Sequence, residues 1–516
     1  MTQECSVGID LGTTFSSLAW VDGAGHVESL RLSNGTYTVA SAVYFKSKSV
    51  VIVGSEAYDY ALMYPDRVAR KFKRDMCKEG ADFECDGRKY RPQELSAMIL
   101  KKLLKEAEPV IGPVRKAVIS VPFVFDDARR QATIDAGRIA GLDEVELVDE
   151  PVAAGIAYGN KLFSGHRRFA DQELEEMFTD ETLLVYDLGG GTFDATIMRL
   201  GKDAKFEVIA TAGDWELGGE DWDDVLLNAI VDAYELSIGE DVRTCKEHMQ
   251  ELRRFAIDAK KTLSERPRVD LNIAVSGSRA TVTLSRGDFE RDSLYLLTRT
   301  TDTVSEMLRD NQMDWNYIDR ILLVGGSSRM PMVHKQLHRI TGREFDMSLP
   351  PDTAIAQGAA LFAAFHAGNA NVSVSDVVTV NSHPIGLAVH NRKTNRVVND
   401  VILKANTPTL TAEFREYDVP DPDLGVQLVI LLGNDDPSAC ARLGRVWITG
   451  IPKGARKPKV RVSYCFQENG MLAVEGVVIH KGGQPIKAKT ELAIEGKMPE
   501  DEVEDAVQTL KGIDFA

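Results

Sequence analysis

Apolar positions in the first 150 residues change between two periods. A strand-like apolar run, VGIDLG, occupies residues 7–12. In residues 92–108, apolar side chains recur every three or four positions behind a leading proline, which predicts an amphipathic helix. The pattern then predicts a strand over 116–123, a helix over 126–142 and a strand over 145–150. This strand–helix–strand succession is typical of an α/β fold.

The same alternation returns in the middle of the chain. The strand-like run VYDLGGG is followed by a hairpin pattern and by long helices near residues 221–264. Strands are predicted near 268–284, and a helix is predicted from Asp288, because Ser285 and Asp288 have the S-x-x-D spacing of a helix cap. A third apolar strand, RILLVGG, ends in glycines. The α/β pattern therefore extends to about residue 370.

From about residue 371 the helical period disappears. Short alternating runs, among them LGVQLVILLG, KVRVSYCF and GMLAVEGVVI, are separated by Gly, Asn, Asp and Pro. This pattern predicts a compact all-β domain up to residue 495. The last stretch, MPEDEVEDAVQTLKGIDFA, has room for one helix of at most about four turns.

Composition supports this division and excludes several classes of protein. The 516 residues suggest about two to four domains. The net charge is −17, yet residues 381–516 hold 17 basic and 18 acidic side chains, so nearly all the excess lies before them. An acidic chain is a poor match for a general nucleic-acid or anionic-membrane surface.

The six cysteines show no CxxC pairing, and the N-terminus has no apolar leader. Neither a disulfide framework nor a zinc module is indicated, and no apolar run approaches the length of a membrane span. We therefore expect a cytoplasmic protein with no nucleic-acid or membrane partner.

Three apolar strands end in glycine-rich turns: IDLGTT (9–14), YDLGGGTFD (186–194) and VGGSSR (324–329). Such turns expose backbone N–H groups, which can bind phosphate without side-chain bulk. Asp10 and Asp187 precede the first two turns, and a carboxylate beside phosphate implies an intervening Mg²⁺ with its waters. A single turn of this kind is as easily an ordinary tight connection, but two near-copies predict duplicated halves that face one nucleotide. No Walker A motif is present at these sites.

Seven segments in family order resemble the ATPase domain of the seventy-kilodalton heat-shock chaperones. They are VGIDLGTTFS, SVPFVFDDARRQATIDAGRIAGL, ELVDEPVAAGIAYG, VYDLGGGTFDAT, TAGDWELGGEDWD, ILLVGGSSRMP and PPDTAIAQGAALFAA. The later VNSHPIGLAV and GRVWITGIPKGARKPKVRVSYCFQENGMLAVEG resemble, more weakly, the β-sandwich with which that family binds unfolded peptide.

The resemblance implies an α/β fold and a domain order. It implies a duplicated actin-like ATPase with ribonuclease-H-like halves over residues 1–370, a linker over 371–380 and a peptide-binding β-sandwich over 381–496. Residues 497–516 would be a short C-terminal tail with no helical lid.

The resemblance also implies roles for single residues. Lys73, Glu150, Asp187, Thr192 and Asp10 would serve ATP hydrolysis, with Asp10 and Asp187 holding Mg²⁺ through water. For Lys73 a rival interpretation is that it is one surface cation in the run RKFKR. Residues that would contact the nucleotide come from both halves of the ATPase domain: Gly12, Thr13, Thr14, Phe15, Gly189, Gly190, Gly191, Thr192, Gly218, Gly219, Lys260, Lys261, Ser264, Gly325, Gly326, Ser327, Ser328, Arg329 and Asp352.

The implied activity is slow ATP hydrolysis that switches the affinity of the β domain for extended peptide. The implied cofactors are ATP or ADP and Mg²⁺, with K⁺ as a further candidate ion. The implied partners are unfolded peptide segments, a J-domain co-chaperone and a nucleotide exchange factor, in protein folding and the stress response.

Three features depart from the family pattern. The chain ends at Ala516, where the family continues with a helical lid, so we expect faster peptide exchange. The linker contains SDVVTV in place of a leucine-rich strip, and Ile257 stands where the family usually has an acid that contacts adenosine. These departures leave open a nucleotide-sensing scaffold whose β domain binds one dedicated partner. An actin-like filament or a sugar kinase is a weaker alternative, because neither needs the β-rich region.

Overall fold

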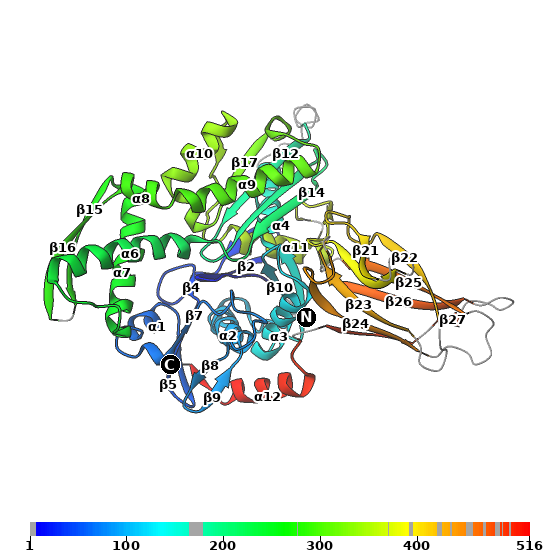
Figure 1. Cartoon of the computed structure of the whole chain (residues 1–516), viewed down its shortest axis with the longest axis horizontal. Helices are drawn as coiled ribbons and strands as arrows, with labels where there is room; N and C mark the ends of the chain where they lie inside the picture. Colours follow the sequence, from blue (N-terminus) through cyan, green and yellow to red (C-terminus); the bar gives the residue numbers. More distant parts are fainter. Residues whose placement is uncertain are drawn as a thin grey trace.

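The computed structural model describes residues 7–164, 179–275, 277–369, 371–391, 396–419, 426–433, 436–449, 458–467, 471–479, 486–487, 489–494 and 497–515. It is a mixed α/β structure (Figure 1). We call residues 7–164 the first lobe, residues 179–346 the second lobe and residues 385–494 the β domain.

The first lobe is built on a six-stranded sheet. Its central strand β1 runs parallel to β10 and antiparallel to β2, and β10 runs parallel to β11. Helices α2 (Pro92–Ile111) and α3 (Asp127–Ala140) contribute to the same apolar core as β1. The strands are, in sheet order, β11 (Glu144–Asp149), β10 (Lys116–Val121), β1 (Val7–Leu11), β2 (Phe15–Val21) and β3 (Val27–Ser29), with β4 (Val39–Ala40) paired to β2.

A second, smaller sheet completes the first lobe. It contains the C-terminal strand of the chain, in the order β29 (Asp514–Phe515), β6 (Val50–Val53), β5 (Ala42–Ser47) and β7 (Val68–Arg70). The remaining elements of this lobe are α1 (Ser55–Tyr60), the 3₁₀ turn η1 (Pro65–Arg67) and the hairpin β8 (Phe83–Cys85) with β9 (Arg88–Tyr90).

The second lobe has a sheet of the same strand directions. Its central strand β12 runs parallel to β17 and antiparallel to β13. The strands are, in sheet order, β18 (Phe345–Asp346), β17 (Arg320–Val324), β12 (Glu181–Leu188), β13 (Phe193–Leu200), β14 (Lys205–Asp214) and β19 (Asp376–Val378). The other elements are α6 (Gly219–Ile238), α7 (Lys246–Glu265), β15 (Arg268–Val275), β16 (Ser278–Ser285), α8 (Arg286–Asp292), α9 (Leu294–Asp310), η2 (Trp315–Tyr317), η3 (Gly326–Arg329) and α10 (Pro331–Thr341).

Two helices, α4 (Glu150–Ser164) and α11 (Ala354–His366), lie between the two large sheets (Figure 1). They touch closely, because a Cβ atom at Gly358 would overlap with the backbone of Ala153. Side chains of β10, β12, β13 and both helices share one apolar cluster. The two sheets are therefore joined by a packed layer rather than by a flexible connection.

The β domain consists of two antiparallel sheets around one apolar core. The first has the order β21 (Arg396–Leu403), β20 (Ile385–Asn391), β23 (Val426–Leu432), β24 (Ala441–Thr449) and β28 (Lys489–Ile494). The second has the order β22 (Ala412–Asp418), β25 (Lys459–Phe466), β26 (Leu472–Ile479) and β27 (Ile486–Lys487). After it, α12 (Glu500–Lys511) returns to the first lobe.

Several predicted elements are confirmed. The helix predicted over 92–108 is α2, and Ser285 caps α8 by accepting a hydrogen bond from the Asp288 amide. The predicted linker contains β19, which pairs in parallel with β14, so part of the linker extends the sheet of the second lobe.

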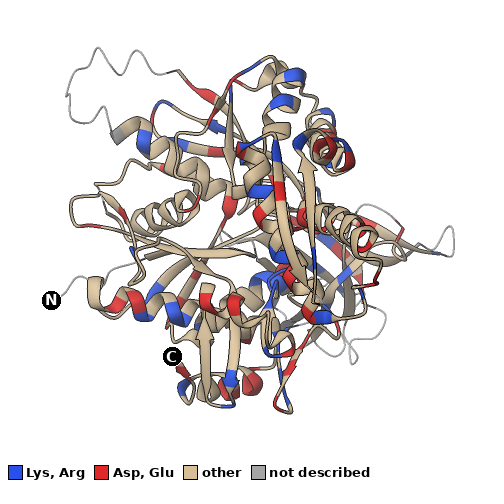
Figure 2. Cartoon of the chain, turned by 90° about the vertical axis from the view of Figure 1, so that its left-hand side faces the viewer, with Lys and Arg blue, Asp and Glu red and all other residues tan. Residues whose placement is uncertain are grey.

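Acidic and basic residues are interspersed along the elements seen in Figure 2. Among the described residues, no helix combines the length and apolarity needed to cross a bilayer.

Candidate functional site

A cleft of about 770 Å³ lies between the two lobes. It receives residues from the ends of β1 and β12, from α7 and from the turn after β17. Because β1 and β12 are the central strands of their sheets, the two glycine turns that follow them lie on opposite sides of the same cleft. The fold thus brings residues that are far apart in sequence to one site.

The first two glycine turns touch each other across this cleft. A Cβ atom at Gly190 would overlap with Thr14 Oγ1, and one at Gly191 would lie 2.6 Å from Thr13 Oγ1. Glycine is therefore required at both positions by the close approach of the opposite loop. The Thr14 hydroxyl is buried and has no hydrogen-bond partner among the described residues. It is a donor available to a ligand held between the loops.

Four carboxylates gather beneath these loops: Asp10, Glu150, Asp187 and Asp194. Burial and the charge of Glu150 raise the pKa of Asp10 to about 7, although Lys73 and a hydrogen bond from Ser120 oppose the shift. The same two causes, burial first, raise the pKa of Asp187 and of Asp194 well above the usual range. Without a compensating cation, ionisation of these acids is unfavourable.

Lys73 is the basic side chain that compensates part of this charge. Its Nζ donates a 2.6 Å hydrogen bond to Glu150 Oε1, and only 3% of the Lys73 side chain is exposed. It also lies 5.6 Å from the centre of the Phe125 ring. Lys73 is therefore not one of the surface cations of the run RKFKR, which was the rival interpretation from the sequence.

The donors present fit a hydrated divalent cation. Asp10 and Asp187 both line the cleft. Burial raises their pKa values because it disfavours the ionised carboxylates, and a cation between them would offset that cost. Within the part of the chain that the structure describes, no three His, Cys, Asp or Glu side chains are arranged to hold a metal by themselves. A cation here would therefore need water and phosphate oxygens to complete its coordination.

The other end of the cleft is formed by α7 and by the turn after β17. Lys260 Nζ donates to the Gly219 carbonyl at 2.6 Å and pairs with Asp223 at 2.9 Å. Arg329 pairs with Asp352 at 3.5 Å, and both side chains are at least half exposed. This end offers charged and hydroxyl groups around an open space, as a nucleoside would need.

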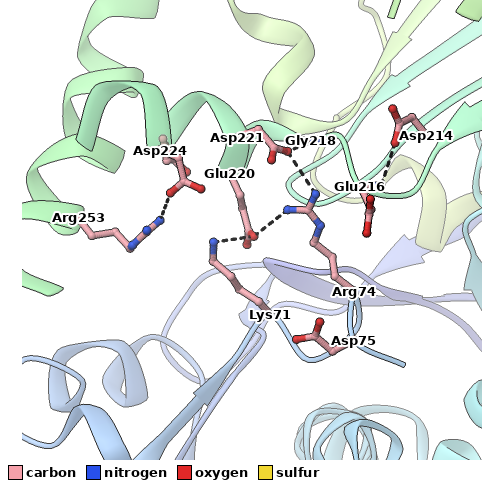
Figure 3. A network of polar contacts seen from close by, with 12 residues as sticks. Lys71, Arg74, Asp75, Asp214, Glu216, Gly218, Glu220, Asp221, Asp224 and Arg253 are labelled. Carbon is pink, nitrogen blue, oxygen red and sulfur yellow. Dashed lines mark hydrogen bonds and ion pairs between the residues drawn. The ribbon is translucent and has the colours of Figure 1, made fainter. Parts of the chain in front are cut away.

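A charged contact, which we call the interlobe bridge, joins the lobes beside the cleft (Figure 3). Lys71 Nζ lies 2.8 Å from Glu220 Oε2, and Arg74 contacts both Glu220 and Asp221 on α6. Lys71 has a φ of 65°, an uncommon conformation for a residue other than glycine. The bridge was not predicted from the sequence RKFKR. That run does not show that the Lys71 and Arg74 side chains point toward α6, whereas the Lys73 side chain points toward Glu150.

A second unpredicted contact joins the two lobes across the cleft. Arg70 donates to Gln250 Oε1 on α7, and its guanidinium lies 5.3 Å from the centre of the Tyr58 ring. All three residues line the cleft. Burial is the main cause that lowers the pKa of Arg70 and raises that of Tyr58 to about 12. The basic residues that precede Lys73 in the sequence suggested a charged contact in this region, but they did not indicate that Arg70 would contact Gln250.

Most residues predicted for the site line this one cleft. Four do not: Gly191 contacts the Thr13 side, Gly218 and Gly219 precede and open α6, and Ser328 donates to the Gly325 carbonyl at 2.7 Å. Those that line the cleft are Asp10, Gly12, Thr13, Thr14, Phe15, Lys73, Glu150, Asp187, Gly189, Gly190, Thr192, Lys260, Lys261, Ser264, Gly325, Gly326, Ser327, Arg329 and Asp352.

Comparison with known proteins places this geometry in context. The family model described as Hsp70 protein matches residues 6–84 and 77–513. The chain is 34% identical to the protein named Chaperone protein DnaK of Thermotoga petrophila over 523 residues, which cover 99% of this chain and 84% of that protein. The protein of the same name from Thermotoga maritima gives the same values. The one from Thermotoga neapolitana is 35% identical over 494 residues, with 93% and 79% covered.

Proposed function

The chain belongs to the Hsp70 family, and on that premise we propose how its parts carry out the family's activity. The family match establishes the general function: the chain is an ATP-dependent molecular chaperone that assists protein folding, and it is an ATPase. Nucleotide binding with a divalent metal, and binding of unfolded peptides and co-chaperones, follow from the same match. The alternative of a dedicated nucleotide-sensing scaffold is not favoured by it.

The nucleotide would lie in the interlobe cleft with its phosphates between the two glycine turns. One observation carries this assignment: Gly190 and Gly191 of the second lobe approach Thr14 and Thr13 of the first directly above the buried carboxylates. Phosphate oxygens would accept hydrogen bonds from the exposed backbone N–H groups and from the unpartnered Thr14 hydroxyl. The adenosine would lie against Lys260, Lys261 and Ser264 of α7 and the turn after β17.

Mg²⁺ would be the divalent ion, held through water by Asp10 and Asp187, with K⁺ as a further candidate ion. When bound, Mg²⁺ neutralises phosphate charge and polarises the bond that is broken. The two carboxylates would fix its position, and their raised pKa values are consistent with sites that ionise fully only beside a cation.

Lys73 and Glu150 would act on the γ-phosphate and on the attacking water. The buried Lys73 ammonium would stabilise the charge of the transferring phosphoryl group, and Glu150 would keep Lys73 in place while orienting the water. Thr192, which lines the cleft and is buried, would donate to the γ-phosphate.

We further propose the domain assignment expected from the sequence. Residues 1–370 would be the duplicated actin-like ATPase with ribonuclease-H-like halves, 371–380 the linker and 381–496 a β-sandwich that holds extended peptide. Support comes from the equal strand directions of the two large sheets and from the shared core of the two β-domain sheets. A J-domain protein and an exchange factor would be the co-chaperones, and a cytoplasmic location stays a prediction.

Isothermal titration with ATP and Mg²⁺, followed by steady-state hydrolysis, tests this assignment. We expect one nucleotide per chain, no binding after chelation of the metal, and hydrolysis that an unfolded peptide and a J-domain protein both accelerate. Hydrolysis that is indifferent to both additions would contradict the chaperone cycle proposed here. The matched control for the peptide is a folded protein of similar length and charge.

A further inference from the structure

The two carboxylates proposed to hold Mg²⁺, Asp10 and Asp187, occupy matching positions in the two large sheets. Asp10 lies on β1, between the parallel strand β10 and the antiparallel strand β2. Asp187 lies on β12, between the parallel strand β17 and the antiparallel strand β13. The residues beside the two carboxylates can therefore be compared strand by strand.

In the first sheet, Asp10 has a hydroxyl neighbour on the parallel strand. Ile9 and Ile119 are in register, and Asp10 and Ser120 are the next residues of β1 and β10. Ser120 Oγ donates a 2.8 Å hydrogen bond to Asp10 Oδ1, and no part of the Ser120 side chain is exposed. Because a buried hydroxyl needs an acceptor, this bond holds one oxygen of the carboxylate on the β10 side.

In the second sheet, the matching neighbour is apolar. Asp187 is in register with Val324 on β17. The Val324 side chain is buried and belongs to the apolar cluster between the two sheets. Among the residues that the structure describes, none forms a hydrogen bond with the Asp187 side chain. The carboxylate of Asp187 therefore lacks the support that Ser120 gives to Asp10.

The antiparallel neighbours differ as well. Asp10 is in register with Ser17 on β2, whereas Asp187 is in register with Asp194 on β13. The Ser17 hydroxyl is buried and has no hydrogen-bond partner in the described part of the chain. Ser17 thus places a second hydroxyl beside Asp10 without bonding to it. Asp194 offers Asp187 another carboxylate rather than a donor.

We propose that Ser120 is a positioning residue for Asp10, and that the two metal carboxylates are unequal because only Asp10 is held in place before the metal binds. This inference rests on the proposed function, since it takes the metal site between Asp10 and Asp187 as its premise. A carboxylate that already has one orientation loses less side-chain freedom when a hydrated cation binds to it. The sequence signal is a single hydroxyl residue within the apolar run AVISV of β10.

Metal binding to the full chain in the presence of ADP tests this role. Mn²⁺ is the probe, because the paramagnetic resonance signal of the free ion gives its dissociation constant directly. We expect Ser120→Ala to raise that constant by about tenfold, as for the loss of a group that orients a metal ligand. Ser120→Thr keeps the hydroxyl and should stay within about threefold of the wild type. Unchanged Mn²⁺ affinity in Ser120→Ala would overturn the proposal.

Ser17→Ala is the matched control. It also removes a buried hydroxyl from a strand beside Asp10, but that hydroxyl makes no hydrogen bond. We expect its Mn²⁺ affinity to equal that of the wild type. An equal loss of affinity in Ser17→Ala and Ser120→Ala would show that the hydrogen bond to Asp10 is not the cause. Thermal unfolding without nucleotide verifies that each variant is folded.

A gain of affinity tests the inequality of the two carboxylates. Val324→Thr keeps nearly the same shape and places a hydroxyl beside Asp187, as Ser120 stands beside Asp10. We expect the Mn²⁺ dissociation constant to fall by about threefold or more, because the unsupported carboxylate gains a donor. Unchanged or weaker binding in a folded Val324→Thr variant would contradict the inequality.

The dependence of ATP hydrolysis on free Mg²⁺ separates positioning from chemistry. Ser120→Ala should raise the half-saturating Mg²⁺ concentration by about tenfold and leave the rate at saturation within about threefold of the wild type. A lower saturating rate with an unchanged half-saturation would overturn the positioning role. Failure of the premise is distinguishable: a wild-type chain that binds no Mn²⁺ with ADP refutes the metal site itself. Normal wild-type binding with unchanged Ser120→Ala refutes the role of Ser120 alone.

Discussion

The two interfaces of the first lobe differ in what holds them together. Toward the second lobe, apart from the apolar layer of α4 and α11, contact around the cleft is made by charged side chains, with Lys71 and Arg74 facing acids of α6. Toward α12 and β29 (residues 500–515), contact is made by apolar side chains that complete a core, and the ion pairs of Glu500 and Glu502 are peripheral. The first interface leaves buried carboxylates whose ionisation a bound cation would favour. At the second interface, side chains of the chain itself already fill the apolar core. One is thus suited to ligand-dependent change, whereas the other is stabilised by apolar burial without any ligand.

The largest effect is expected at the centre of the cleft. Lys73→Ala should reduce the rate of ATP hydrolysis by about 10²- to 10³-fold, because the ammonium stabilises charge that develops during phosphoryl transfer. Single-turnover hydrolysis and titration with ATP measure chemistry and binding separately. Lys71→Ala is the matched control, since Lys71 lies two residues away but contacts Glu220. Equal loss in both variants would remove the special role of Lys73.

On the apolar interface, deletion of side-chain volume should act on local opening rather than on chemistry. Leu510→Ala should lower the free energy of opening of residues 500–515 by about 2–4 kcal/mol, as expected for a buried leucine. Gln508→Ala, on the exposed face of α12, should change it by less than about 0.5 kcal/mol. Native-state hydrogen exchange gives both values. A hydrolysis rate that falls with Leu510→Ala as strongly as with Lys73→Ala would erase the distinction between the interfaces.

How much of each interface could be predicted from the sequence depends on whether its residues form a local motif or come together only in the fold. The glycine turns after β1 and β12, with Asp10 and Asp187 before them, are local motifs, and the central position of both strands places them together. Lys73 was predicted by resemblance, but its burial beside Glu150 needed the fold.

The docking of α12 and β29 on the first lobe and the interlobe bridge left weaker signals in the sequence. β29 is two residues long and pairs with a strand near the other end of the sequence, so no periodicity reveals it. The helix of the final stretch was expected, but its docking surface combines α2 and α3, which only tertiary structure brings together. For Lys71, the direction of the side chain depends on a local backbone conformation that residue type does not specify.

The pH dependence of stability should also separate the interfaces. Asp10 has a pKa of about 7 in the folded chain and 3.8 as its ordinary value, so the folded state binds the proton more tightly. Stability of the ligand-free protein should therefore fall as pH rises from about 4 to about 7, and Asp187 and Asp194 shift in the same direction. Thermal unfolding measured at several pH values checks this. Asp194→Asn should weaken the dependence, and a melting temperature that rises with pH over this window would contradict it.

The smallest effect is expected for the interlobe bridge, and it decides whether charge alone governs opening of the cleft. Lys71 is about one third exposed, so its pair with Glu220 is partly screened by water. Lys71→Ala should accelerate ADP dissociation by about two- to fivefold, and added salt should reduce the difference from the wild type. Stopped-flow release of a fluorescent ADP measures the rate. Lys78→Ala, which removes a pair with Asp75 inside the first lobe, is the control and should leave the rate unchanged. If the Lys71 effect persists undiminished at high salt, the bridge acts through the local backbone conformation of residue 71 rather than through its charge.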